Sequence, residues 1–316
     1  MKKISFVIPC YNEQDSLPLL KCELTPICDM LRESYDLEII LVDDGSTDRT
    51  WQFIMDWSVE DPIVRGIMLS RNFGHQLALT CGYDHATGDA MISFDADLQD
   101  DITVIPRMIE KWEQGTDIVF AVRSQREKDT FFKRATAKLF YAIQQKICKT
   151  TAPQNCADFR LMNRSSLNAL LTLRERARIL RTMVGWCGFK TDTVYFERQE
   201  RSAGTTKYSL KKMIDLAMDG IFSFTDLPLK IAYYFSGIFL LICLGYLVYN
   251  GYCWFSQPHK LESGWLSLVV LITGFNALTL FCLGIMGEYI SRIYNEVKQR
   301  PLYLVARKTE HSSENE

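Results

Sequence analysis

The sequence predicts an α/β domain followed by two membrane-spanning helices. Over the first 200 residues, short runs rich in Ile, Val and Phe alternate with helical patterns of about 15 to 30 residues. That rhythm is typical of βαβ units and of a mostly parallel sheet covered on both faces. Further along, two stretches of 25 and 23 residues carry no charged side chain. Each is long enough to cross a hydrocarbon core that needs ~20 residues.

Composition limits the possible functions. With 316 residues, 47% of them hydrophobic, the chain can bury a large core and is not disordered. A net charge of -2, from 36 basic and 38 acidic residues, gives no overall attraction to nucleic acid, so none is expected as a partner. The 10 cysteines include no C-x-x-C pair and are interpreted as reduced cytosolic thiols. The apolar run Ile4 to Cys10 is too short for a signal peptide and predicts the first strand.

Five apolar runs predict the strands of the sheet: "ISFVIP" (4–9), "LEIILVDD" (37–44), "VRGIML" (64–69), "AMISFDAD" (90–97) and "DIVFAVR" (117–123). Between them, Ser16 ahead of Pro18 marks one helix start, and Thr47 with Asp48 precedes another. The charged stretch "SQREKDTFFKR" after Arg123 is expected to be a mobile loop or a solvated connection.

Four polar clusters follow the first four strands: "PCYNE" (9–13), "DDGSTD" (43–48), "SRNFG" (70–74) and "DADLQD" (95–100). All would lie at carboxyl ends of strands, where open α/β sheets bind ligands at a topological switch point. Turns are often polar, but four such clusters on one edge predict a binding site.

The last cluster predicts a metal site. In an extended segment Asp95, Asp97 and Gln99 would project to one side, because alternate side chains share a face. Carboxylate and amide oxygens suit Mg²⁺ or Mn²⁺, with phosphate filling the remaining positions. The alternative, that the cluster only caps the next helix, fits Asp100 or Asp101 better than Asp95.

Other phosphate-binding motifs are absent from the sequence. It contains neither G-x-G-x-x-G nor G-x-x-x-x-G-K-[ST], which disfavours a hydride-transfer cofactor and a P-loop nucleotide. A diphosphate would therefore depend on the metal and on nearby cations. The first two clusters add acceptors and an aromatic face suited to a base and a ribose, from Tyr11, Asn12, Glu13, Asp43 and Asp44.

The uncharged stretches 231–255 and 265–287 are predicted membrane spans, with two buried core helices as the alternative. Basic residues flank their outer ends, whereas the connection between them has only Lys260, so both termini are expected in the cytoplasm. Ahead of the spans, apolar residues recur at helical spacing from Leu210 to Phe224, which predicts a helix at the membrane interface or packed on the soluble domain. The expected divisions are a cytoplasmic α/β domain at 1–205, an interfacial region at 206–229, two transmembrane helices at 230–290 and a cytoplasmic tail at 291–316.

Seven motifs together carry a family resemblance: "VIPCYNE", "VDDGSTD", "LSRNFG", "DADLQD", "DFRLMNR", "RSAGTTKY" and "GEYISRIY". From about residue 4 to 303 the chain resembles the GT-A fold, family 2 glycosyltransferases that charge polyprenyl phosphate, above all the bactoprenol (undecaprenyl-phosphate) glucosyltransferases. Dolichyl-phosphate mannose synthase and the undecaprenyl-phosphate aminoarabinose transferase are relatives of that group. Ala157, in place of a usual Gly, and Asp101-Ile102, in place of a common proline, depart from the pattern without removing a ligand.

The resemblance implies a Rossmann-like GT-A domain and roles for individual residues. Nucleotide binding falls to Pro9, Tyr11, Glu13, Asp43 and Asp95, and metal binding to Asp95, Asp97 and Gln99. The acceptor would meet Arg123, Arg126, Arg134, Arg160, Arg201 and Lys207, of which Arg201 and Lys207 resemble binders of the lipid phosphate. The catalytic set would be Asp97, Asp158, Arg201 and Lys207. Arg126 and Arg134 could equally be solvated surface.

The implied activity is inverting, Mg²⁺- or Mn²⁺-dependent transfer of a hexose, with UDP-glucose the expected donor, to undecaprenyl phosphate in the bacterial inner membrane. The lipid-linked product would serve O-antigen-type glycan modification, and the enzyme is expected to form a homo-oligomer. A phosphate acceptor is largely dianionic at neutral pH, so Asp158 is expected to position arginines, with a base role left open.

Four rival interpretations remain. The sugar could be N-acetylglucosamine, galactose or an aminoarabinose derivative. A processive polysaccharide synthase is disfavoured, because the Q-x-x-R-W pattern is missing. A sugar-1-phosphate nucleotidyltransferase is disfavoured, because it would require a glycine-rich basic loop after the first strand, where this chain has "CYNE". A non-catalytic nucleotide-sugar sensor or scaffold would bind UDP without turnover.

Overall fold

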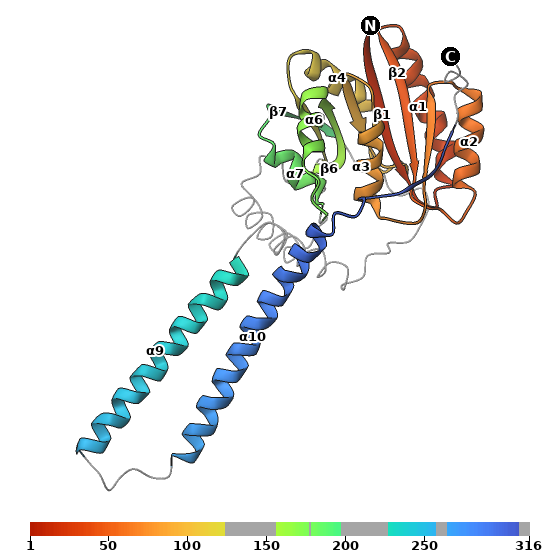
Figure 1. Cartoon of the computed structure of the whole chain (residues 1–316). Helices are drawn as coiled ribbons and strands as arrows, with labels where there is room; N and C mark the ends of the chain where they lie inside the picture. Colours follow the sequence, from red (N-terminus) through yellow and green to blue (C-terminus); the bar gives the residue numbers. More distant parts are fainter. Residues whose placement is uncertain (124–155, 177, 197–226, 257–263, 310–316) are drawn as a thin grey trace. The chain divides into compact units, whose positions relative to one another are not determined.

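The computed structural model describes the chain except for residues 124–155, 177, 197–226, 257–263 and 310–316 (Figure 1). The contact pattern divides it into two units, which are described separately. One unit is Met1–Lys207 together with Arg300–Glu316, and the other is Tyr208–Gln299. The stretch 210–224, for which a helix was expected, lies outside the described residues.

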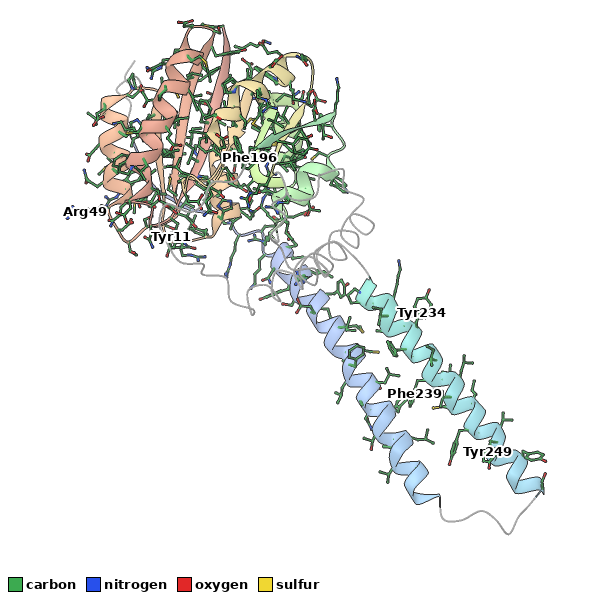
Figure 2. The ribbon with its side chains drawn as sticks, turned by 180° about the vertical axis from the view of Figure 1, so that it is seen from behind. Tyr11, Arg49, Phe196, Tyr234, Phe239 and Tyr249 are labelled. Atoms are coloured by element: carbon green, nitrogen blue, oxygen red, sulfur yellow. The ribbon has the colours of Figure 1, made fainter. Side chains whose placement is uncertain are left out.

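The second unit contains two long helices, α9 (Leu227–Ser256) and α10 (Trp265–Val297). Within them, Pro228–Tyr249 and Leu271–Val297 are long and apolar enough to cross a membrane. The helices pack on each other through aromatic rings, since the centroids of Phe239 and Phe275 lie 6.4 Å apart (Figure 2). Most of their large apolar side chains are exposed, as expected if lipid covers them. The two uncharged stretches in the sequence therefore form helices of spanning length.

The first unit is built on an eight-stranded sheet of order β7-β5-β6-β4-β1-β2-β3-β8 (Figure 1). The β1–β2, β2–β3, β1–β4 and β5–β7 pairs are parallel, whereas β6 runs antiparallel to β4 and β5, and β8 antiparallel to β3. The strands are β1 (Lys2–Cys10), β2 (Tyr35–Asp43), β3 (Val64–Leu69), β4 (Ala90–Ser93), β5 (Ile118–Arg123), β6 (Cys156–Asn163), β7 (Thr191–Phe196) and β8 (Val305–Lys308). The predicted α/β fold with a mostly parallel sheet is confirmed.

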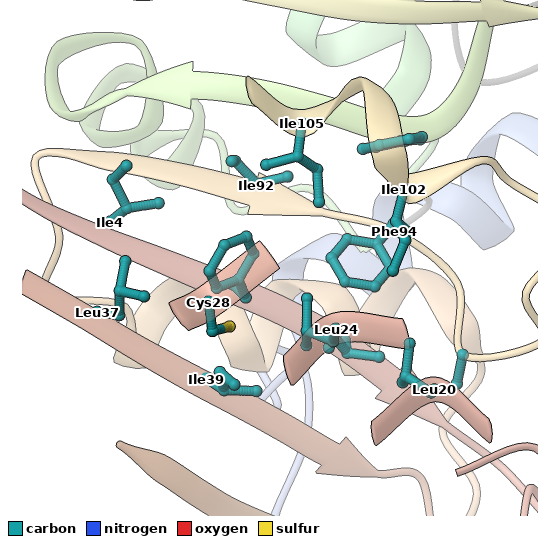
Figure 3. Close-up of a cluster of buried hydrophobic side chains, with 14 of the residues drawn as sticks. Ile4, Leu20, Leu24, Cys28, Leu37, Ile39, Ile92, Phe94, Ile102 and Ile105 are labelled. Carbon is teal, nitrogen blue, oxygen red and sulfur yellow. The ribbon is translucent and has the colours of Figure 1, made fainter. Parts of the chain in front are cut away.

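Helices cover both faces of the sheet. They are α1 (Ser16–Arg32), α2 (Thr50–Glu60), α3 (His75–His85), α4 (Ile105–Glu113), α6 (Arg164–Thr172) and α7 (Leu180–Trp186), with a short 3-10 turn η1 (Ile102–Val104) before α4. The main core joins α1, α2 and α4 to alternate strand residues such as Ile4 and Ile39 (Figure 3). Leu20 and Leu24 of α1 are fully buried there, and each such side chain stabilises the fold by roughly 1.5–3 kcal/mol.

Helix α3 covers the opposite face, behind β1 and β2. It approaches β1 so closely that a Cβ on Gly82 would stand 2.2 Å from Val7 Cγ1. Only glycine fits at that contact.

The amino end of the sheet holds a buried and well-paired carboxylate. Glu38 accepts hydrogen bonds from Ser5 Oγ (2.5 Å), Thr87 N (2.6 Å) and Thr87 Oγ1 (2.9 Å). Lys3 Nζ and Arg65 Nη1 each lie 3.3 Å from Oε2. Burial pushes the pKa of Glu38 upward, but these hydrogen bonds and Lys3 outweigh it, so the pKa lies below its ordinary value. Both carboxylate oxygens are thus satisfied.

Strand order places the switch point between β1 and β4. From β1 the chain steps to β2 and β3 on one side, then returns to place β4 on the other side of β1. The polar clusters after β1, β2, β3 and β4 therefore share the carboxyl edge, as the sequence predicts, and the switch point lies between the segments that follow β1 and β4.

Candidate active site

The ends of β1 and β2 form one interlocked wall of the site. Asn12, with φ 54°, accepts at Oδ1 from Thr47 N (2.9 Å), while its own N–H donates to Ser46 Oγ (2.9 Å). Asp43 is buried, and its Oδ1 accepts from Ser46 N (2.9 Å). Next to these bonds, Tyr11 lies at the edge of the first unit and is 46% exposed (Figure 2). The wall therefore offers a fixed carboxylate and an accessible aromatic ring.

One oxygen of Asp43 is left without a partner. Oδ2 is enclosed and finds no hydrogen bond among the described residues. Burial raises the pKa of Asp43, against the lowering effect of its bonds to Ser46. A hydroxyl or N–H of a ligand would satisfy this oxygen, which is the role that the family resemblance gives to Asp43. Pro9, in the same wall, is buried, and Glu13 donates its backbone N–H to Thr50 Oγ1 (2.8 Å).

Asp44 fixes the loop after β3. Its two oxygens accept from Phe73 N (2.7 Å) and Gly74 N (2.8 Å). Beside it, Gly45 has φ 68°, and a Cβ there would stand 2.5 Å from the carbonyl carbon of Arg71. The two loops can meet only because this position is glycine. The "SRNFG" cluster is thereby tied to the "DDGSTD" cluster.

The segment after β4 turns instead of extending. β4 ends at Ser93, and Leu98 has φ 54° in the turn that follows. The extended geometry expected for residues 95–99 is therefore wrong. Gln99 is buried and folds back, with Nε2 2.5 Å from Asp97 Oδ2. The left-handed backbone of Leu98 turns the chain, so Gln99 reaches the side chain of Asp97 although the segment is not an extended strand.

Asp95 has one carboxylate oxygen without a hydrogen bond among the described residues. This oxygen, Oδ1, is enclosed and lies 3.6 Å from His75 Nε2, although 36% of the side-chain surface reaches solvent. Burial raises the pKa of Asp95 to about 6; His75 opposes this rise, while Asp158, Asp100 and Asp97 add to it. Such a concentration of carboxylates is suited to a cation.

The residues present fit a hard divalent cation in a limited way. In the described parts of the chain no three His, Cys, Asp or Glu side chains form a ready-made metal cage. The enclosed Oδ1 of Asp95 accepts no hydrogen bond among the described residues, and His75 Nε2 stands 3.6 Å away, so this oxygen can still take a cation, with Asp97 two residues along the chain. Two carboxylates with open positions are what Mg²⁺ bound to phosphate requires, because this ion is seldom enclosed by protein alone.

Asp158, on β6, is held by donors from three sides. Arg160 Nη2 donates to Oδ1, Gln76 Nε2 donates to Oδ2 (3.1 Å), and His75 Nε2 lies 3.2 Å from Oδ2. Burial would raise the pKa of Asp158, but Arg160, His75 and Arg181 hold it well below its ordinary value. A carboxylate so paired stays ionised at neutral pH and is a poor proton acceptor. Its surroundings favour a positioning role over a base.

Comparison of the sequence with known proteins identifies the family to which the chain belongs. The family model "Glycosyl transferase family 2" matches residues 5–171, more than half of the chain. The protein belongs to this family.

Relatives of this family 2 glycosyltransferase align over nearly its whole length. The uncharacterized glycosyltransferase YkcC of Bacillus subtilis (strain 168) is 43% identical over 95% of this chain and 92% of that protein. The prophage bactoprenol glucosyl transferase homolog of Escherichia coli (strain K12) is 39% identical over 96% and 99%, respectively. The bactoprenol glucosyl transferase of Shigella phage SfX is 39% identical over 96% and 98%.

Among solved structures, the family 2 chain is similar to glucosyl-3-phosphoglycerate synthase from Mycobacterium tuberculosis in complex with Mn²⁺, UDP-glucose and phosphoglyceric acid. The TM-score is 0.47 at 16% identity, covering 69% of this chain and 76% of that chain.

The remaining expected residues of the family 2 enzyme divide into two groups. Arg123 Nη2 donates to Asp100 Oδ1 (3.1 Å), and Arg160 is fully buried behind Asp158. In this structure Arg160 holds a carboxylate and presents no surface to an acceptor. The other four expected cations, Arg126, Arg134, Arg201 and Lys207, lie outside the described residues.

Sequence reasoning missed three residues of the candidate site: His75, Gln76 and Arg181. His75 bridges two carboxylates, with Nε2 also 3.6 Å from Asp95 Oδ1. Burial lowers its pKa, but Asp158 and Asp95 raise it more, so the pKa lies above its ordinary value. The signal was within reach, because His75 and Gln76 directly follow the "SRNFG" cluster. Arg181 has no such signal, since it comes from α7.

Proposed function

We propose that this family 2 glycosyltransferase transfers glucose from UDP-glucose to undecaprenyl phosphate, with inversion at the anomeric carbon and a Mg²⁺ or Mn²⁺ requirement. One observation carries the reaction type: carboxylates gather around Asp95, whose enclosed Oδ1 accepts no hydrogen bond among the described residues. This acidic group suits a metal-bound diphosphate, and His75 stands between it and Asp158. The choice of glucose and of a polyprenyl phosphate is supported by the names of the relatives at 39% identity.

Donor binding would use the wall at the ends of β1 and β2. Tyr11 can stack on the base, and the free Oδ2 of Asp43 can accept from the nucleoside. Asp95 and Asp97, with Gln99, would hold the metal, which when bound neutralises charge on the leaving diphosphate. Since the carboxylates alone repel a diphosphate, donor affinity would depend on that ion.

The acceptor needs little activation. A phosphate monoester has its second pKa near ~6 and is largely dianionic at neutral pH, so no base need remove a proton. Among the described residues, His75 would help to orient it, because its ring lies between Asp158 and Asp95. Arg160 is buried and holds Asp158 in place. Direct displacement by the phosphate oxygen on an α-linked donor gives a β-linked product, and orientation with charge neutralisation supplies most of the rate.

The membrane arrangement is part of the proposal. Helices α9 and α10 would cross the bacterial inner membrane, with the catalytic unit and both termini in the cytoplasm, where nucleotide sugars are found. Arg201 and Lys207 would meet the lipid phosphate near the headgroups. The product would supply a glucosyl group for O-antigen-type modification, and copies of the chain would associate as a homo-oligomer.

A direct assay tests the proposal. Purified, detergent-solubilised protein is incubated with Mn²⁺ or Mg²⁺, undecaprenyl phosphate and each of a panel of labelled UDP-sugars, and label is followed into organic-extractable lipid. We expect transfer from UDP-glucose that is lost in Asp97→Ala and kept in Asp36→Ala, which removes an exposed carboxylate distant from the site in β2. Transfer from another donor would replace glucose in the proposal. UDP binding without any lipid product would contradict it and favour a sensor.

A further inference from the structure

After α10 the chain returns to the first unit, which holds the candidate active site and which we call the catalytic unit. We name Arg300–Thr309 the return segment. Leu304 O accepts from Ser70 N (2.9 Å), β8 pairs with β3, and Thr309 exchanges two bonds with the backbone of Gly66 (2.8 and 3.0 Å). Arg176 Nη2 also donates to Arg300 O. The segment is therefore an added strand of the sheet, although all four residues of β8 are exposed.

Tyr303 of the return segment grips the last turn of α3. Its hydroxyl donates to Asp84 Oδ2 (2.8 Å). Arg174 donates to both oxygens of the same carboxylate (2.9 and 2.7 Å). With 15% of its side chain exposed, Asp84 is largely enclosed and accepts from three donor atoms. Charge-assisted bonds of this kind are stronger than neutral ones.

The first turn of the same helix contacts Asp158. Gln76 donates from Nε2 to Asp158 and accepts at Oε1 from Leu180 N (3.0 Å), so its amide orientation is fixed. His75 contacts Asp158 from the same turn. Because α3 sits against β1 at the Gly82 contact, the helix has little freedom to bend between its two ends.

The return segment also holds the approach to α3. Ser70, which bonds Leu304, begins the loop whose Phe73 and Gly74 amides are bound by Asp44. That loop leads directly into His75. The start of α3 is thus set by Asp44 and Leu304, and its end by Tyr303.

We propose that the return segment is a positioning element of the transferase, and that Tyr303, through Asp84 and helix α3, sets the placement of Gln76 and His75 on Asp158. The inference rests on the proposed function. Under this proposal the return segment, which follows α10 in the chain, completes the catalytic unit, so the C-terminal part of the chain does more than anchor the protein. Tyr303 touches no reacting group and acts only through the helix.

Tyr303→Phe in the full-length protein tests the proposal, because it removes one hydroxyl and leaves the ring. Tyr195→Phe, which removes a hydroxyl from an exposed tyrosine of β7, is the matched control. We expect faster amide hydrogen exchange over residues 70–80 in Tyr303→Phe alone. We also expect kcat to fall about three- to tenfold, the equivalent of one hydrogen bond, with the KM for UDP-glucose unchanged.

A double-mutant cycle with Gln76→Ala separates positioning from general stability. If Tyr303 acts through Gln76, the two changes together reduce kcat by less than the product of their separate effects. The proposal would be overturned if the double mutant lost kcat by the full product of the two separate effects. It would also be overturned if Tyr303→Phe matched Tyr195→Phe in both amide hydrogen exchange and kcat. If the wild-type protein transfers no sugar, the proposed function fails instead, and the exchange data still decide whether the return segment holds α3.

Discussion

The two ends of the sheet hold their carboxylates in opposite ways, one buried and paired and the other half-buried. At the amino end, Glu38 has hydrogen bonds or ion pairs to both oxygens, and its pKa lies below the ordinary value. At the carboxyl end, Asp95 has an enclosed oxygen without a hydrogen bond, and its pKa is raised to about 6. The first arrangement stabilises the fold by itself. The second is the place where we propose that a cation binds, at a cost in the stability of the metal-free fold.

The largest expected effect is on kcat, which should depend on the carboxylate at the carboxyl end of the sheet and not on the one at the amino end. Asp95→Asn removes one charge with little change in shape and should lower kcat by about 10³-fold or more, because the metal-bound leaving group loses a ligand. Glu38→Gln makes the same chemical change at the other end and should leave kcat within about threefold at temperatures where the protein stays folded. Initial rates of lipid-linked glucose formation measure both. Equal losses in the two variants would contradict the contrast.

Asp158 sharpens the comparison, since it lies at the binding end yet is fully paired. Asp158→Asn should reduce kcat by about 10²-fold by releasing Arg160 and His75. Because the pKa of Asp158 is lowered, its charge is present at every pH above ~4, and it cannot produce a limb near neutrality.

The pH dependence of kcat for the wild type and for Asp158→Asn is the measurement. Both should rise through about pH 6, with ionisation of the acceptor phosphate and of Asp95, whose pKa is also raised to about 6. Loss of this limb in Asp158→Asn alone would show that Asp158 is a base after all.

A smaller effect is expected on stability at the amino end. Glu38→Gln should lower the free energy of unfolding by about 1–3 kcal/mol at pH 7, because several buried donors lose a charged acceptor. Since the folded-state pKa of Glu38 is lowered, this contribution is present above ~4.3, the unfolded value, and is lost as pH falls through the folded value. Denaturant unfolding at pH 7 and pH 3 should show the difference between the two proteins shrinking at the lower pH. A difference that grows would contradict the assignment.

The sequence predicted the features that depend on neighbours in the chain. Apolar runs marked β1 to β5, and polar clusters marked the carboxyl ends of the first four, because both follow from local pattern and sheet geometry. The strands β6, β7 and β8 were not predicted. The turn at Leu98 was missed, since a left-handed residue other than glycine leaves no clear signal. Contacts between distant residues were missed as well. His75 meets Asp158 across 83 positions, and "VARK" of β8, which is wholly exposed, lacks the alternation that identifies a strand.

The central claim is that the carboxyl end of the sheet is left incomplete for a cation, and apparent Tm tests it most directly. Without metal, Asp95→Asn should raise the Tm by about 2–4 °C, from roughly 1 kcal/mol of relieved repulsion after allowance for solvent exposure, while Glu38→Gln lowers it. Mn²⁺ with UDP should then raise the Tm of the wild type and of Glu38→Gln, but not that of Asp95→Asn. A lower Tm for metal-free Asp95→Asn, or an equal gain from Mn²⁺ and UDP in all three proteins, would contradict the account.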